Sequence, residues 1–282
     1  MISDLIYDVG MHNGNDTAYY LHKGYRVVAI EADPTWVVKT RQRFAAEIAA
    51  RHLTILNVGI AQKSGPQTFW ISDSHSEFNS FNRELAARDG LPHHAIEVEC
   101  LTFDSILADY GVPYYLKVDI EGHDHLCIQA LSPNDLPRYI SAESGGLPLL
   151  NQLHAAGYDS FKCLSQFNFL PVELPPTLPQ RYYQSLQQLW QSHHPVARFI
   201  KRVVGWQRVT HQLRRYRQRA DWHFAEGSAG PFGEETPGRW HSFAEMQPAY
   251  LHFAALSRNQ VRSGLWDDTT FSFWADFHAR RL

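Results

Sequence analysis

The fold is decided by Leu5-Ile-Tyr-Asp-Val-Gly-Met-His-Asn-Gly14, a short apolar run that ends in an acid and passes into a turn with two glycines. Residues 15–23 follow with helical character, and Gly24 is a natural end for that helix. Arg26-Val-Val-Ala-Ile30 is a second apolar run, with Glu31 at its end. This order predicts a strand, a tight turn, a helix and a second strand, the opening unit of an α/β sheet.

The same alternation continues to about residue 165. We expect further strands at residues 53–58, 114–119, 139–143, 160–164 and 271–277, and an edge or cross strand at 96–101. Helices are expected between them at 34–50, 103–110, 121–131 and 148–156. Strands that alternate with helices at this spacing require a parallel sheet with both faces covered. The predicted class is therefore α/β, with a seven-stranded, mostly parallel sheet.

Composition narrows the functional class. The 282 residues are 44% hydrophobic and 20% charged, which excludes an intrinsically disordered chain. The net charge of −3 is unlike that of a basic nucleic-acid-binding domain, so no nucleic-acid partner is expected. The three cysteines are widely spaced and form neither a zinc motif nor a disulfide framework. No apolar run approaches the ~18 residues of a membrane span. The N-terminal residues do not have the pattern of a secretory leader. The expected location is the cytoplasm.

Acidic residues stand at the ends of four predicted strands. They are Asp8, Glu31, Asp119 and Glu143. The carboxyl ends of parallel strands meet at one edge of a sheet, where ligands of open α/β folds bind. A single acid at a strand end is commonplace, but four together favour a binding site.

The turn after the first strand indicates an adenosine cofactor. Gly10 permits a sharp turn, Gly14 permits close backbone approach to a ligand, and Glu31 follows 17 residues later, where a carboxylate can accept both hydroxyls of a ribose. His12 occupies the place of the middle glycine of a dinucleotide fingerprint. Since a pyrophosphate needs that glycine and a cofactor without phosphate does not, S-adenosylmethionine is favoured over NAD.

Four motifs in this order resemble those of the FkbM family of S-adenosylmethionine-dependent methyltransferases. They are Asp8-Val-Gly-x-x-x-Gly14, Val28-Ala-Ile-Glu-Ala-Asp-Pro34, Asn57-Val-Gly-Ile-Ala61 and Leu116-Lys-Val-Asp-Ile-Glu-Gly122. The resemblance covers roughly residues 5–165 and implies a class I, Rossmann-like methyltransferase fold. It also implies O-methylation of sugars, glycans or polyketide hydroxyls. This chain departs from the family pattern at Met11-His12-Asn13 and at His123-Asp124.

The resemblance implies roles for the first three motifs. Asp8, Gly10 and Gly14 would shape the methionine side of the cofactor pocket, together with His12, Asn13 and Thr17 of the same loop. Glu31 would hold the ribose, with Ala32 and Asp33 beside the adenine, and Asn57 and Gly59 would lie against the base. For Asn57, a turn residue that satisfies its own backbone is an equal alternative.

Methylation of a sugar hydroxyl needs a general base or a metal ion that lowers the hydroxyl pKa. We expect Asp119, Glu143 and His123 to be the catalytic residues. Asp119 and Glu143, with Glu121 between them in sequence, are hard oxygen ligands suited to Mg²⁺. The alternative needs no metal, with Asp119 or His123 as the base.

The second half of the chain differs in composition after a proline-rich break at residues 171–179. We expect residues 1–171 to form the cofactor-binding core, 172–268 a largely helical cap over the site, and 269–282 the final strand of the core. Phe232, Glu234, Glu235 and Trp240, in or beside a glycine-rich loop, are the candidate substrate contacts.

Residues 196–219 combine basic and apolar residues at helical spacing, with no acid between Arg198 and Arg219. This pattern is typical of a basic-faced helix packed on its own domain, which we favour, or of a helix on an anionic membrane or polyanionic substrate. The membrane alternative would place the protein peripherally at the inner membrane.

The predicted function is therefore methyl transfer from S-adenosylmethionine to a hydroxyl of a sugar, glycan or glycolipid precursor, including a lipid-linked glycan acceptor. An NAD-dependent sugar oxidoreductase or epimerase is an alternative, although the Tyr-x-x-x-Lys pair it would need is absent. A non-catalytic adenosine-binding module at a membrane surface is the other alternative. No oligomeric state is predicted.

Overall fold

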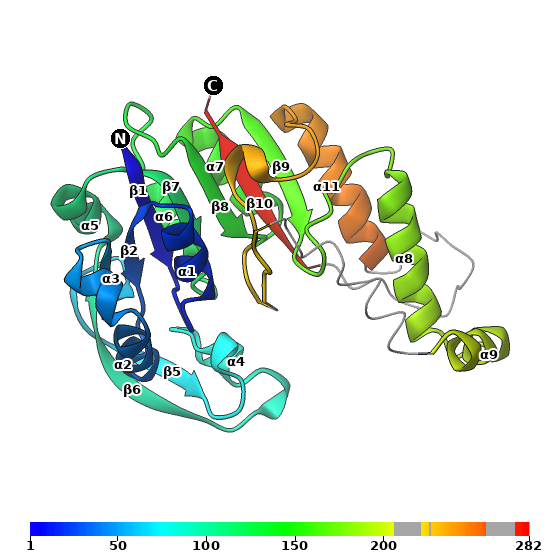
Figure 1. The fold of residues 1–282 in the computed structure, drawn as a ribbon, viewed down its shortest axis with the longest axis horizontal. Helices are drawn as coiled ribbons and strands as arrows, with labels where there is room; N and C mark the ends of the chain where they lie inside the picture. The colour runs from blue at the N-terminus through cyan, green and yellow to red at the C-terminus, as the bar shows by residue number, and fades with distance from the viewer. Residues whose placement is uncertain (206–220, 226, 258–273, 282) are drawn as a thin grey trace. The chain divides into compact units, whose positions relative to one another are not determined.

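The computed structural model describes residues 1–205, 221–225, 227–257 and 274–281. The chain divides into two compact units (Figure 1). Unit 1 comprises Met1–Tyr158 with Ala279–Arg281, and unit 2 comprises Asp159–His278. The predicted boundaries at residues 171 and 268 remain predictions.

Unit 1 follows the predicted alternation of strands and helices. Its larger elements are β1 (Ile2–Val9), α1 (Asn15–His22), β2 (Arg26–Ile30), α2 (Pro34–Arg43), α3 (Ala45–Ala49), β3 (Leu53–Leu56), α5 (Phe103–Tyr110), β7 (Pro113–Val118), α6 (Asp124–Gln129), β8 (Tyr139–Glu143) and α7 (Leu147–Ala156). The single helix predicted for residues 34–50 is two helices, because Phe44 leaves helical geometry with φ −109° and ψ 28°.

The large sheet has seven strands in the order β3-β2-β1-β7-β8-β10-β9. The pairings β1–β2, β2–β3, β1–β7 and β7–β8 are all parallel, which confirms the mostly parallel α/β class. β1 is central in unit 1, and its residues 5–9 lie between β2 and β7 and are all buried. The register places Asp8 opposite Lys117 on β7, a pairing that matters at the site.

A second, three-stranded sheet in the order β4-β6-β5 was not predicted as such. It consists of β4 (Gly59–Ile60), β5 (Gly65–Ser72) and β6 (His93–Leu101), and β6 extends the cross strand expected at residues 96–101. The short elements η1 (Ser76–Phe78), α4 (Arg83–Ala86) and η2 (Arg88–Gly90) join β5 to β6. Phe69, Val98 and Cys100 form the small core of this sheet, with Phe81 packed against it.

Unit 2 contains β9 (Ser160–Ser165), α8 (Leu178–Gln191), α9 (Pro195–Val204), η4 (Gly233–Glu235), α11 (Phe243–Ser257) and β10 (Ala275–Arg280), whose last two residues belong to unit 1. The final strand was predicted at residues 271–277. Its observed bounds are shifted toward the C-terminus, and residues 271–273 lie outside the described part. Among the described residues, no helix has the length and apolar character needed to cross a membrane.

Candidate active site

The candidate site lies at the carboxyl edge of the large sheet, where β1, β2 and β7 end. The N–H groups of Gly10 and Met11 both donate to the Ile30 carbonyl at 3.0 Å, which holds the turn after β1 to the end of β2. The Asp119 N–H donates to the Val9 carbonyl at 2.9 Å. Gly10 has φ +84°, and a Cβ there would lie 1.8 Å from the Asp119 carbonyl oxygen. Only glycine at this position permits the turn after β1 to approach the loop after β7 this closely.

A buried ion pair between Lys117 and Asp8 lies next to this edge of the sheet. The Lys117 ammonium lies 3.3 Å from Asp8 Oδ1 and donates to the Gly10 carbonyl at 2.7 Å, while Thr17 Oγ1 donates to Asp8 Oδ2 at 2.6 Å. Burial alone would lower the pKa of Lys117, but the carboxylates of Asp8 and Asp119 outweigh it and raise this pKa above its usual range. Lys117 is therefore a fixed positive charge beneath the loops.

Glu31 is placed at the end of β2 as predicted and is 9% exposed. Its two carboxylate oxygens each accept one backbone N–H, from His12 at 2.7 Å and from Asp33 at 2.8 Å. Burial raises the pKa of Glu31 to about 7, against the lowering effect of these two bonds. A carboxylate oxygen offers about two acceptor positions, so each oxygen keeps capacity for a ribose hydroxyl.

The rest of the loop after β1 is shaped by protein contacts. His12 has φ +49°, its Nε2 lies 2.8 Å from Ser76 Oγ, and its ring lies 4.3 Å from that of Trp36. The Asn13 side chain accepts the backbone N–H two residues later, at 3.0 Å. Gly14 has φ +77° at the start of α1, and a Cβ there would meet the ring of Phe44. Gly14 therefore provides close approach to a protein ring, and its contact with a ligand remains a prediction.

Asp33 caps α2 and anchors the segment that joins β5 to α4. One of its oxygens accepts the Thr35 N–H at 2.8 Å and the other accepts the Asn79 amide at 3.0 Å. Both carboxylate oxygens of Asp33 thus accept hydrogen bonds from the protein. The family resemblance implied that this residue lies beside the adenine. Its contact with the base remains a prediction.

Asn57 and Gly59 follow β3. The Asn57 amide donates to the carbonyls of Glu31 and Ala32 at 3.0 and 3.1 Å, so it ties the end of β3 to the end of β2. It is exposed and does not simply satisfy its own turn. A Cβ on Gly59 would lie 2.3 Å from the ring of Phe81, which explains the glycine by packing.

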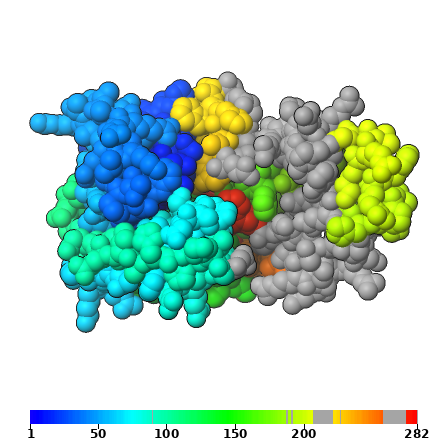
Figure 2. All heavy atoms as spheres, turned by 90° about the horizontal axis from the view of Figure 1, so that it is seen from below, coloured from blue at the N-terminus to red at the C-terminus, as the bar shows by residue number. Residues whose placement is uncertain are grey.

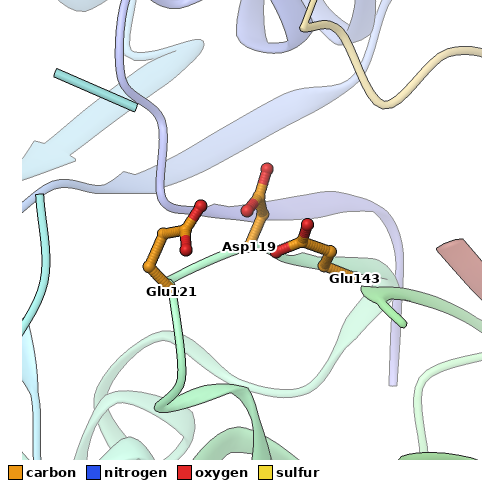
Figure 3. Close-up of side chains that lie close together, drawn as sticks. All are labelled: Asp119, Glu121 and Glu143. Carbon is orange, nitrogen blue, oxygen red and sulfur yellow. The ribbon is translucent and has the colours of Figure 1, made fainter. Parts of the chain in front are cut away.

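Three carboxylates converge where β7 and β8 end (Figure 3). Asp119, Glu121 and Glu143 each place one carboxylate oxygen within 4.8 Å of the other two, and all three residues are half-buried. Asp119 and Glu121 come from the loop after β7, and Glu143 is the last residue of β8. This confirms the expected proximity of Asp119 and Glu143.

The environment of Glu121 makes it a titratable group near neutral pH. Burial and the neighbouring Asp119 carboxylate raise the pKa of Glu121 to about 7, although Arg88 lies 3.2 Å from it and acts in the other direction. Glu121 has φ +44°, and its carbonyl accepts Ser80 Oγ at 2.8 Å. The Glu121 backbone thus adopts a left-handed conformation that is rare for a residue with a Cβ. The hydrogen bond from Ser80 to its carbonyl helps to hold this conformation.

His123 is engaged with the small sheet. Its Nδ1 lies 3.0 Å from the Ile60 carbonyl, and its ring stacks on Phe81 at 4.8 Å with an interplanar angle of 5°. Asp124 accepts the N–H groups of Ile120 and Gly122 and so closes the turn before α6. These contacts give His123 a packing role, and its part in proton transfer remains a prediction.

The candidate substrate contacts lie in unit 2. Phe232 is buried inside this unit, whereas Glu234 and Glu235 are exposed. Glu234 accepts the Trp240 indole N–H at 3.0 Å, and the Lys162 ammonium lies 4.5 Å from the centre of the Trp240 ring. Their contact with an acceptor remains a prediction.

Two contributors were missed by sequence reasoning. A lysine inside an otherwise apolar strand indicates a buried charge that needs a partner, and this signal could have identified Lys117. Its partner Asp8 is 109 residues away, so only the strand register reveals the pair. Arg88 carried no comparable signal, because it reaches Glu121 from the segment between β5 and β6.

The strand order, the glycine turn after β1 and the acids at the strand ends define a Rossmann-like fold of the class I methyltransferase type. The family model described as "Methyltransferase FkbM domain" matches residues 8–158. The chain therefore belongs to the FkbM methyltransferase family.

Solved structures give weaker similarity. The chain resembles methyltransferase FkbM from Methylobacillus flagellatus KT with 18% identity and a TM-score of 0.34, over 50% of this chain and 33% of that one. It also resembles the C-terminal domain of precorrin-6Y C5,15-methyltransferase from Rhodobacter capsulatus, with 16% identity and a TM-score of 0.34, over 57% and 67% of the two chains. The chain thus spans about a third of the length of the first of these structures. No match was found among curated proteins.

Proposed function

We propose that this chain is an S-adenosylmethionine-dependent O-methyltransferase that acts on a hydroxyl of a sugar, glycan or glycolipid precursor. The observation that carries the proposal is the convergence of Asp119, Glu121 and Glu143 at the same sheet edge as the glycine turn and Glu31. Carboxylates placed this way provide a base for a hydroxyl that is a poor nucleophile at neutral pH.

The residues at the ends of β1 and β2 fit an adenosine cofactor without phosphates. Glu31 is buried with spare acceptor capacity on both oxygens. His12 stands in place of the middle glycine that lets a dinucleotide-binding turn approach a pyrophosphate. Bound S-adenosylmethionine would supply an electrophilic methyl group. The turn after β1 would hold its methionine part and Glu31 its ribose.

The chain's own contribution to the reaction is to orient the hydroxyl and take its proton. Glu121, with a pKa near 7, is partly ionised at neutral pH and is poised to accept that proton. Asp119 and Glu143 lie close enough to orient the same hydroxyl. The Lys117 ammonium joins the turn after β1 to the loop after β7. It donates to the Gly10 carbonyl and lies 3.7 Å from the Asp119 carboxylate.

The same three carboxylates fit a hard divalent cation. Their oxygens are the donor type that Mg²⁺ prefers, and a bound Mg²⁺ would lower the pKa of the acceptor hydroxyl. The acceptor hydroxyl is thus activated either by a bound Mg²⁺ or directly by a carboxylate that takes its proton. Activity measured with a chelator distinguishes these two mechanisms.

The experiment is methyl transfer with Glu121→Gln and Asp119→Asn, using Glu97→Gln on the exposed face of β6 as a control. We expect turnover to fall by about 10²–10⁴-fold in the two site variants, with S-adenosylmethionine affinity within a few fold. Loss of activity with EDTA and recovery with Mg²⁺ would support the metal form, and indifference to EDTA the direct base. Full turnover in both site variants would contradict the proposal.

We also propose a cytoplasmic location. The three cysteines are free and buried in the structure. Unpaired cysteines are the state that a reducing compartment maintains.

A further inference from the structure

Helix α9 exposes its apolar side chains. Val196, Phe199 and Val203 are 50%, 66% and 67% exposed. They follow one another at spacings of three and four residues, so they lie on one face of the helix. An amphipathic helix of a globular domain normally buries this face. For residues 196–204 the structure leaves this apolar face exposed. Residues 206–219, the rest of the stretch that we expected to pack on its own domain, lie outside the described residues.

Helix α9 is held in unit 2 by contacts that do not involve its exposed apolar side chains. Ala197 is fully buried, and the Lys201 ammonium donates to the Ser192 carbonyl at 2.7 Å. The His194 side chain accepts the Val196 N–H at 3.3 Å and caps the first turn. α9 also packs against α8, whose end it follows in Figure 1. Because these contacts fix the helix, its exposed apolar face is available to a partner.

Positive charge borders this apolar face. Arg198 and Arg202 are exposed and lie beside Phe199 and Val203 on the helix surface. No acidic residue occurs anywhere between Glu173 and Asp221, a stretch that carries nine lysines and arginines. In Figure 2, the yellow-green block that includes α9 lies at the surface seen in that view. The described surface of α9 thus joins apolar and cationic side chains, and the helix itself contains no acidic residue.

We propose that α9 docks on an anionic lipid surface, with Phe199, Val196 and Val203 at the headgroup–acyl boundary and Arg198 and Arg202 at the lipid phosphates. A helix with one apolar and one cationic side is suited to lie in that interface. Charge complementarity selects the occupant, since a neutral apolar partner would leave the arginines unmatched. With 10 residues, α9 is too short to span a bilayer. The inference does not depend on methyl transfer.

The test is flotation of the full chain with vesicles of phosphatidylcholine containing about one third phosphatidylglycerol, against vesicles of phosphatidylcholine alone. We expect binding only to the anionic vesicles, weakening as salt is raised. The Phe199→Ser/Val203→Ser variant should lose at least about tenfold in binding, and Arg198→Ser/Arg202→Ser about tenfold or more. Phe199→Leu should retain binding.

Matched controls come from unit 1. Val38→Ser removes an apolar side chain that is 56% exposed on α2, and Lys63→Ser removes an exposed charge. Neither should change vesicle binding. S-adenosylmethionine affinity should be equal in all variants, which separates failure of this inference from failure of the cofactor site.

Three results would overturn the inference. They are no flotation of the parent with anionic vesicles at low salt, equal flotation with neutral vesicles, and unchanged flotation of Phe199→Ser/Val203→Ser. A dimer in light scattering that this variant dissociates, without vesicle binding by the parent, would assign the face to self-association instead.

Discussion

Lys117 shows how one residue organises the candidate site. It is 3% exposed and pairs with Asp8, which is fully buried, while it also holds the Gly10 carbonyl. Removal of one partner of a buried pair leaves the other charge uncompensated. We expect Lys117→Met to lower the free energy of unfolding by about 3–5 kcal/mol, measured by urea denaturation.

The comparison pair for this prediction is Arg26 and Asp4, whose side chains are 47% and 57% exposed. Arg26→Met should leave stability essentially unchanged, because exposed ion pairs contribute little. Adding Asp8→Asn to Lys117→Met should recover part of the loss, since it removes the uncompensated charge. A Lys117→Met protein as stable as the parent would show that the pair is not a structural support.

Glu121 makes stability depend on pH. Its pKa is raised from 4.5 to about 7 in the folded protein, mainly by burial. Between these pH values the folded state holds a proton that the unfolded state has released, so stability falls as pH rises through this window. Relative to the parent, Glu121→Gln should therefore gain about 1–3 kcal/mol between pH 4.5 and pH 8. Parallel stability–pH curves for the two proteins would refute this assignment.

At the scale of elements, Glu31 connects the turn after β1 with the start of α2. It accepts the N–H groups of His12 and Asp33, and the same carboxylate is proposed to hold the ribose. Glu31→Ala should weaken S-adenosylmethionine binding by about 1–3 kcal/mol in calorimetry, because it strips a buried hydrogen-bond partner. Glu97→Ala, on the exposed face of β6, is the matched control. Unchanged affinity in Glu31→Ala would remove this residue from the pocket.

Much of this architecture could be predicted because local signals and tertiary packing agree. β2 and α5 have the bounds predicted from residues 26–30 and 103–110, where apolar periodicity and flanking breakers coincide. The proximity of Asp119 and Glu143 followed from parallel strands alone. The acids could be placed at one edge without knowing which loops connect them.

The rest depended on contacts distant in sequence. β5 pairs with β6 across a segment of short elements, and its residues 65–72 carry glycine and proline that mask the strand pattern. α2 breaks at Phe44, whose ring lies against Gly14, 30 residues earlier, and this contact is not visible in the local sequence pattern. The engagement of His123 by Phe81 and Ile60 likewise needed the position of the small sheet.

The residues matched by the family model coincide with one of the two compact units of the molecule. The match ends at residue 158, which is also the last residue of the main part of unit 1. All the proposed cofactor contacts and all three carboxylates belong to unit 1. Unit 2 carries the candidate acceptor contacts and α9, and it lies outside the residues that the family model matches.

Labelled methyl transfer tests whether this chain moves a methyl group to a hydroxyl. The full chain would be incubated with S-adenosylmethionine labelled in its methyl group and a panel of sugars, glycans and lipid-linked glycans. We predict label in a product that survives mild alkali, as a methyl ether does and a methyl ester does not, and its loss in Asp119→Asn. Label that is released by alkali would show that the acceptor is a carboxylate and not a hydroxyl. Transfer that persists undiminished in Asp119→Asn would show that the reaction does not use this site.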